Sequence, residues 1–181
     1  MRRGSIRSAV LAAGLALVCA GCPLPQPLPV VQRTGGPTVT PPRILVDTAL
    51  PGDAVVTVGS NCPSDSTIAF SATVEDLNLD DTVEARWFVD YSLQKHAPNA
   101  STFAQAAADG TNPLRELAPY RFLPAVEVVD GKSHVVELVV SNGFQPQGTP
   151  GLALPDRSPA PGYETQVFRW FVVADPTGRC E

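Results

Sequence analysis

An acidic stretch with the sequence EDLNLDD contains the residue types that bind hard cations. Asp76, Asn78 and Asp80 occupy the first, third and fifth positions of a calcium loop, where side-chain oxygens are the usual ligands. The pattern then departs from that loop, because Asp81 stands where glycine is required and Trp87 where a bidentate glutamate is required. Asp76, Asn78 and Asp80 are therefore candidates for a looser metal site. The alternative is a solvated turn whose side chains bond the local backbone.

Catalysis of the serine-hydrolase kind has little support in this sequence, because it needs a nucleophile, a base and an orienting acid in one place. Ser133 and His134 are adjacent, so on a strand their side chains point to opposite faces. The other histidine, His96, lies in an irregular segment, and the sequence has no G-x-S-x-G turn. We therefore expect a protein that is not an enzyme and uses no cofactor.

Four cysteines form two groups along the chain. Cys19 and Cys22 end an N-terminal segment in which a basic start precedes a short apolar run, whereas Cys62 and Cys180 lie in the body of the chain. A basic start followed by a short apolar run is typical of a secretory signal. The run is shorter than the roughly twenty residues that a membrane-spanning helix needs.

The end of this segment, residues 19–22 with the sequence CAGC, resembles the lipobox of bacterial lipoproteins. In that family an apolar residue and two small residues precede an invariant cysteine. The resemblance implies that residues 1–21 are removed as a signal peptide and that Cys22 is lipidated and anchors the chain in a membrane. Pro23, in place of an aspartate, implies the outer membrane, with the protein facing the periplasm or the cell surface.

An exported chain folds in an oxidising compartment, where two cysteines of one domain are expected to form a disulfide. We therefore predict a bridge between Cys62 and Cys180. This bridge would close a loop of about 118 residues, and the chain-entropy model gives a loop of that length about 4–5 kcal/mol of stabilisation. A free or metal-bound pair is the alternative, but a metal site needs more ligands than two cysteines and two distant histidines readily offer.

Residues 22–42 are rich in proline, which fixes φ and removes a backbone donor, so neither helix nor sheet is expected there. We predict an extended tether that spans roughly 60 Å at about 3.1 Å per residue. The predicted organisation is a signal peptide at 1–21, a lipidated cysteine and tether at 22–42, and one domain at 43–181. The formal net charge of −5 and the lack of a basic patch argue against nucleic acid as a partner.

From residue 43 onward the chain contains short runs in which apolar and polar residues alternate, typical of strands with one buried face. The predicted strands lie at residues 43–58, 66–75, 82–90, 133–142 and 163–174. The stretch 92–117 breaks this rhythm, and its sequence STFAQAAADG predicts a short helix that Ser101 caps and Gly110 ends. Residues 143–162 are predicted to form a long loop.

The order of these runs resembles the immunoglobulin-like or PKD-like domains of bacterial surface proteins, over about residues 43–175. The resemblance implies an all-β fold, an immunoglobulin-like antiparallel β-sandwich with Trp87 in its core. In that strand order Cys62 and Cys180 fall at the same end of the sandwich. Their bridge departs from antibody-type domains, in which the disulfide joins the second and sixth strands.

These features together predict a non-catalytic lipoprotein of the cell envelope, a structural or protein-interaction component whose partner is another envelope protein. The alternative is a module that binds calcium, a glycan or a peptide through the loops at 76–81 and 143–162. Some aromatic residues flank loops and are candidates to line such a surface, with core packing as the other interpretation. These aromatic residues are Tyr120, Phe122, Phe144 and Tyr163.

Overall fold

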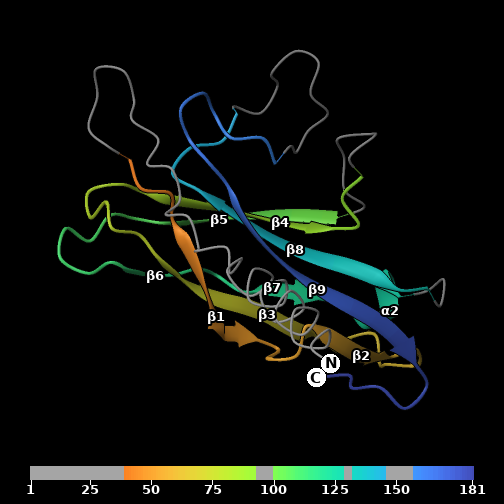
Figure 1. Cartoon of the computed structure of the whole chain (residues 1–181). Coiled ribbons are helices and arrows are strands. Elements are labelled where there is room, and N and C mark those ends of the chain that lie inside the picture. Colours follow the sequence, from red (N-terminus) through yellow and green to blue (C-terminus); the bar gives the residue numbers. More distant parts are fainter. Residues whose placement is uncertain (1–38, 93–99, 129–131, 146–156) are drawn as a thin grey trace, which may run out of the picture. The chain divides into compact units, whose positions relative to one another are not determined.

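The computed structural model describes residues 39–92, 100–128, 132–145 and 157–181, and these residues form a two-layered β-sandwich (Figure 1). The all-β, immunoglobulin-like class expected from the sequence is confirmed. In chain order the elements of these residues are β1 (Arg43–Leu50), β2 (Val55–Gly59), β3 (Ile68–Glu75), β4 (Val83–Val89), β5 (Ala100–Ala106), β6 (Leu114–Glu116), β7 (Tyr120–Phe122), α2 (Pro124–Glu127), β8 (His134–Ser141) and β9 (Gln166–Asp175). In the described part of the chain, no helix has the length and apolar character needed to cross a lipid bilayer.

The two layers differ in size. One sheet contains β1, β3 and β6 in that order, and β7 pairs with β3 farther along the same strand. The other sheet has the order β2-β9-β8-β4-β5. All these neighbours run antiparallel except β2 and β9, which run parallel, so the expected antiparallel sandwich has one exception.

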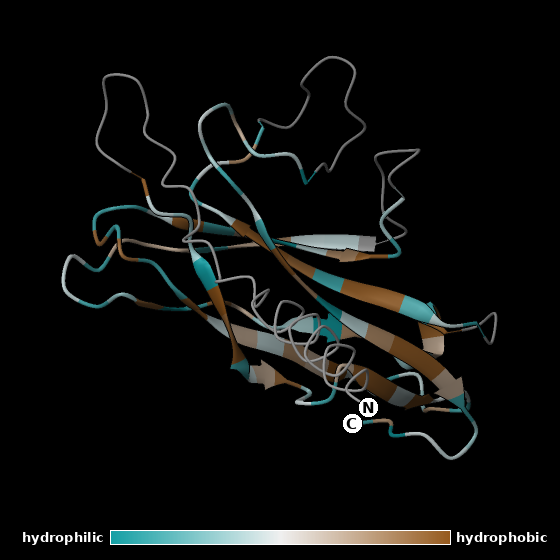
Figure 2. Cartoon of the chain, viewed as in Figure 1, coloured by the Kyte–Doolittle hydropathy of each residue, from teal (hydrophilic) through white to brown (hydrophobic). Residues whose placement is uncertain are grey.

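Two stacked tryptophans form the centre of the core. The rings of Trp87 on β4 and Trp170 on β9 lie 5.9 Å apart, and Phe70 on β3 meets Trp170 edge-on at 5.3 Å. All three side chains are fully buried, so the expected core position of Trp87 is confirmed. Figure 2 shows apolar and polar residues alternating along the strands, as expected where one face of a strand is buried.

The first predicted strand, residues 43–58, is two strands that belong to different layers. β1 pairs with β3, whereas β2 pairs with β9, and a turn at Pro51, Gly52 and Asp53 carries the chain from one sheet to the other. Two hydrogen bonds from β9 hold this crossing. Trp170 Nε1 donates to the Pro51 carbonyl at 2.9 Å, and Phe171 N donates to the Ala54 carbonyl at 2.8 Å.

The helix predicted within residues 92–117 is wrong for the part that the structure describes, and residues 93–99 lie outside it. Ala100–Ala106 form β5, which pairs with β4 from one end to the other, so Ser101 lies inside a strand and caps no helix. The alanines favour a helix, but Thr102 and Phe103 favour a strand, and the ladder with β4 decides the outcome. Tertiary pairing thus overrides a weak local preference.

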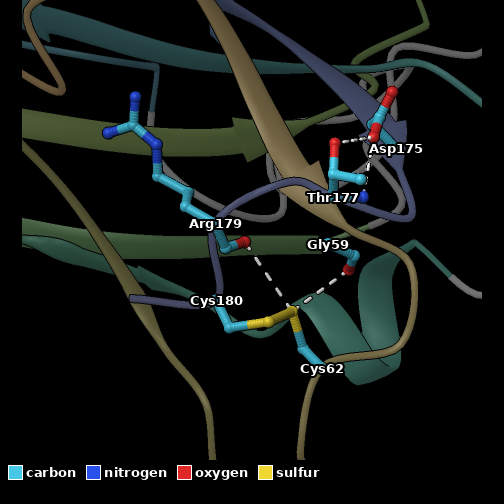
Figure 3. Close-up of a disulfide and its surroundings, with 6 residues drawn as sticks. All are labelled: Gly59, Cys62, Asp175, Thr177, Arg179 and Cys180. Carbon is cyan, nitrogen blue, oxygen red and sulfur yellow. Dashed lines mark hydrogen bonds between the residues drawn. A yellow bond between two sulfur atoms is a disulfide. The ribbon is translucent and has the colours of Figure 1, made fainter.

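The C-terminal residues pass over the end of β2 and bond to its outer edge (Figure 3). On the side of β2 that faces β9, Ser60 N donates to the Asp175 carbonyl at 3.2 Å. On the opposite side of β2, Arg179 N donates to the Thr57 carbonyl at 3.2 Å and Gly59 N donates to the Arg179 carbonyl at 2.8 Å. β2 is therefore bonded on both sides near its end.

The predicted disulfide between Cys62 and Cys180 is present and fastens this tail, with the two Cα atoms 5.5 Å apart across a sequence separation of 118 residues. Figure 3 shows Cys62 Sγ beside the carbonyl oxygens of Gly59 and Arg179, at 3.1 and 3.7 Å. A disulfide sulfur carries no proton, so these are packing contacts. The bridge holds the tail against the segment that follows β2.

Gly178 is the point of closest approach between the tail and β2. A Cβ atom at this position would lie 2.3 Å from the Val58 carbonyl carbon and 2.6 Å from Gly59 N, both of which are backbone atoms that cannot move aside. Only glycine therefore lets the tail cross β2 at this distance.

We expect Gly178→Ala to lower the free energy of unfolding by about 1–3 kcal/mol, because the added methyl group overlaps backbone. Gly52→Ala is the matched control, since the nearest atom to its Cβ would be 3.9 Å away. The control should change stability by less than about 0.5 kcal/mol. Urea unfolding under non-reducing conditions measures both. Equal stability of the two variants would contradict the close crossing.

Candidate functional site

The acidic turn after β3 is tied into the fold through Asp76, whose side chain is fully buried. One carboxylate oxygen accepts a hydrogen bond from Asn78 N at 3.0 Å, and the other accepts from Asn142 Nδ2 at 2.7 Å. Asp76 N itself donates to the Pro113 carbonyl at 2.7 Å. Asp76 thus braces three segments that meet at one end of the sandwich.

The other two metal candidates have different surroundings. Asn78 Nδ2 donates to the Thr40 carbonyl at 2.7 Å, and Asp80 is exposed to solvent. In the part of the chain that the structure describes, no three His, Cys, Asp or Glu side chains are grouped so that they could hold a metal ion. The three candidates thus have different surroundings, because Asp76 is buried among donors, Asn78 bonds Thr40 and Asp80 is exposed, and a looser metal site at this turn stays a prediction.

A buried arginine supports the same turn from the neighbouring strand. Arg115 on β6 is 2% exposed, and its Nη2 donates to the Leu79 carbonyl at 3.1 Å while Nη1 donates to the Asn112 carbonyl. Gly110 N also donates to the Leu79 carbonyl, at 3.0 Å. The turn is thus held by the loop that precedes β6 as well as by Asp76.

The outer face of the five-stranded sheet is partly covered, although alternation assigns it to solvent. Residues 143–145 lie against residues 158–160, with Gln145 N donating to the Ser158 carbonyl and Ala160 N to the Gly143 carbonyl, each at 3.0 Å. We call these two paired segments the stem, and the stem covers a second apolar cluster of Phe88, Val139 and Phe144. The predicted loop at 143–162 therefore contains ordered structure at its two ends, and residues 146–156 lie outside the described part.

A buried carboxylate fixes the stem to the sheet. Glu137 on β8 is 4% exposed, and both of its oxygens lie 3.1 Å from Arg157 Nη1, while Arg169 Nε lies 2.5 Å from Oε1. The guanidinium of Arg157 also lies 4.6 Å from the centre of the Tyr91 ring. A buried charge is tolerated when it is paired and hydrogen-bonded, and here two arginines meet that need.

Arg86 on β4 occupies the same outer face. It is 6% exposed, its guanidinium lies 4.1 Å from the Phe144 ring centre and 5.6 Å from that of Phe103, and Nη2 donates to the Gln145 carbonyl at 3.1 Å. Beside it lies a hollow of about 360 Å³ lined by Glu84, Ala85, Arg86, Phe103, Ala104 and Gln105. This hollow lies over the β4–β5 ladder, a place that the sequence did not indicate.

A second polar cluster lies at the end of the sandwich where β8 begins. His134 Nδ1 lies 2.6 Å from Asp90 Oδ2, and Val135 N donates to Asp90 Oδ1 at 2.8 Å. Asp90 has a φ of 51°, a left-handed conformation that aspartate tolerates better than most residues. Ser133 is exposed and His134 is buried, in keeping with side chains on opposite faces, and His96 lies outside the described residues.

Tyr120 and Glu127 form the neighbouring pair in that cluster. Tyr120 OH donates to Glu127 Oε2 at 2.8 Å, and Leu123 N donates to Oε1 at 2.8 Å. Burial raises the pKa of Glu127 above its ordinary value, even though these hydrogen bonds act in the opposite direction. Burial, with the neighbouring carboxylate, likewise raises the pKa of Tyr120.

The loop-flanking aromatic residues mostly pack inside the protein. Tyr120 and Phe122 belong to the main core and Phe144 to the cluster on the outer face, so none of these three lines an open surface. Tyr163 is half-buried, and its ring lies 2.9 Å from where a Cβ of Gly143 would be. Cys22, the predicted lipidation site, lies outside the described residues.

Comparisons with known proteins identify no family. No protein-family model matches the chain, and no curated protein sequence is significantly similar to it. Among solved structures, the chain is similar to AggA, the major subunit of aggregative adherence fimbriae type I from Escherichia coli. The match has 12% sequence identity and a TM-score of 0.33, and it covers 67% of this chain and 89% of that chain. Nothing about the function of this chain follows from a similarity of that size.

We expect Asp76→Ala to destabilise the protein, because Asn78 N and Asn142 Nδ2 would lose their acceptor. Each buried group left unsatisfied costs about 1–3 kcal/mol. Asp80→Ala, which removes an exposed acid from the same turn, should cost less than about 0.5 kcal/mol. Thermal unfolding with and without calcium chloride measures both. A loss in Asp76→Ala that appears only with calcium would contradict a purely structural role.

Glu127 should make stability depend on pH. Its pKa is raised in the folded state, so the protonated carboxyl stabilises the fold below the ordinary value of 4.5, and this contribution is lost as the pH rises through the folded pKa. Glu127→Gln cannot titrate and should gain stability relative to the native chain as the pH rises above the ordinary value of 4.5. The exposed Glu116→Gln is the matched control in urea unfolding. A stability difference between Glu127→Gln and the native chain that stays constant with pH would contradict this linkage.

Proposed function

We propose that this protein is a lipid-anchored, non-catalytic component of the bacterial cell envelope that acts through protein–protein interaction. The observation that carries the proposal is how the cysteines are used. Cys62 and Cys180 are joined to each other, and Cys19 falls within the proposed signal peptide. Cys22, at the end of the lipobox-like CAGC, is then the one cysteine of the mature chain that remains available for lipid.

The disulfide supports export as well. Such bonds persist in oxidising compartments such as the periplasm and the cell surface, and they are rare in the cytosol. The proposed organisation keeps residues 1–21 as signal peptide, 22–42 as lipidated cysteine and tether, and 43–181 as the sandwich. Pro23 after the lipidated cysteine favours the outer membrane as the site of anchoring.

A non-catalytic role is supported by what the polar side chains do. The buried polar side chains bond other residues of the fold, as Asp76 does with Asn142, and Glu137 and Arg115 do with their own partners. Glu127 accepts hydrogen bonds from Tyr120 and from the backbone of Leu123. Catalysis needs acid, base and charge-stabilising groups that converge on a substrate-sized space. The alternative of a calcium-, glycan- or peptide-binding module has its best support in the Asn142–Asp76 bond, which joins the 76–81 turn to the start of the 143–162 loop.

Replacing Cys22 tests the anchor. We expect Cys22→Ser to lose metabolic labelling with palmitate and to leave the outer-membrane fraction, because each acyl methylene contributes about 0.8 kcal/mol to membrane binding. Cys19→Ser is the matched control and should retain both the label and the membrane association. Detergent-phase partitioning of cell lysates provides a second measurement. Palmitate label in Cys22→Ser, or none in the native chain, would overturn the lipid anchor.

A further inference from the structure

The four outer edges of the two sheets are not equally protected in the described part of the chain. An unprotected edge strand offers unpaired N–H and C=O groups to any other strand, and folded proteins usually block it. The edge of β2 is bonded by Arg179 and fastened by the disulfide. The edge of β1 has an irregular register between Leu45 and Leu50, and Ile44 N donates to the Gln166 side chain of the other layer.

The edge formed by β6 and β7 is protected by its shortness. Each of these strands has three residues, and the segment between them contains Pro119, which cannot donate a hydrogen bond. β5 differs from all the others. It has seven residues, ASTFAQA, with no charge and no proline, and it lies at the border of the five-stranded sheet (Figure 1).

The register shows which groups of β5 face outward. Asp90 N donates to the Val135 carbonyl, so residues 84, 86, 88 and 90 bond toward β8, and residues 85, 87 and 89 bond toward β5. Ala85, Trp87 and Val89 are paired with Ala104, Thr102 and Ala100. The backbone N–H and C=O groups of the intervening Ser101, Phe103 and Gln105 therefore point away from the sheet.

These three residues are symmetric about Phe103. An antiparallel copy of β5, rotated about a two-fold axis at Phe103, sets Phe103 opposite Phe103 and Ser101 opposite Gln105. Every outward N–H then meets an outward C=O of the other strand. We propose that β5 pairs in this way with β5 of a second copy of the chain, which joins the two five-stranded sheets into one continuous sheet.

The side chains suit a second copy as the occupant. Phe103 is 45% exposed, and its ring rests beside Arg86 on the outer face next to the hollow. Phe103 of the second copy covers the exposed part of this ring, and aromatic cross-strand pairs are favourable. The chain has a net charge of −5, yet the uncharged strand places no like charges opposite one another across the axis. The pairing does not depend on the lipid anchor.

A disulfide trap tests this register. Directly opposite, hydrogen-bonded residues have Cα atoms about 5.5 Å apart, which is within the range that a disulfide spans. F103C in the full chain should therefore form a covalent dimer on non-reducing gels. S101C is the matched control, because its two copies would lie about 14 Å apart, four residues along the strand. Absence of the F103C dimer, or equal crosslinking of S101C, would overturn the proposal.

Sedimentation of the native full chain in mild detergent gives an independent readout. A pair of single strands is a small interface, so we expect a reversible monomer–dimer equilibrium. F103K sets two like charges opposite each other and should weaken the dimer at least about tenfold, whereas Q105K faces serine and should weaken it less. Unchanged thermal unfolding in both variants controls for folding. A native chain that stays monomeric at every concentration, or F103K and Q105K with equal effect, would contradict the pairing.

Discussion

The passage of the C-terminal tail over β2 is the constraint on which the closure of the sandwich depends. β2 runs parallel to β9 and is reached only after the chain has crossed from one layer to the other at Pro51. Without the tail, β2 would be a short edge strand with one neighbour. Gly178 allows the tail to cross, Arg179 supplies the second set of bonds, and the Cys62–Cys180 bridge keeps both in place. Each of these contacts depends on the others, because a tail held less closely could not reach Thr57 and Gly59.

The outer face of the larger sheet is likewise held by several kinds of contact together. Its covered part combines apolar contact at Phe88, Val139 and Phe144 with a buried carboxylate between two arginines. Such a pair gains little net stability, since burial of the charges offsets much of their attraction. It does define one position for the stem of residues 143–145 and 158–160. Arg86 extends the covered area toward β5, where the stem ends and Phe103 remains half-exposed.

The sequence alone predicted the strands whose inner faces alternate, because a period of two can be read from each short run. It also predicted the disulfide, because a signal-like N-terminus implies an oxidising compartment in which two cysteines pair. It did not predict the burial of Glu137, since an acid among apolar residues is most simply assigned to solvent and its partner Arg157 is 20 residues away. β8 carried a signal, because its sequence VVELVV is apolar on both faces. β5 was missed for a related reason: an alanine-rich segment takes its conformation from the neighbour it pairs with. Likewise, the role of Asp76 depends on Asn142, 66 residues away.

The disulfide also determines how the domain responds to mechanical force. Any pull applied between the N-terminal side of β1 and the C-terminus is carried along residues 43–62, through the sulfur atoms, and out through Cys180. The chain between the two cysteines, which are 118 positions apart, lies outside this load path, so tension between the two ends cannot extend it while the bridge is intact. β1 and β2 lie on this load path, whereas the strands from β3 to β9 lie between the two cysteines and feel the tension only through their contacts with β1, β2 and the tail.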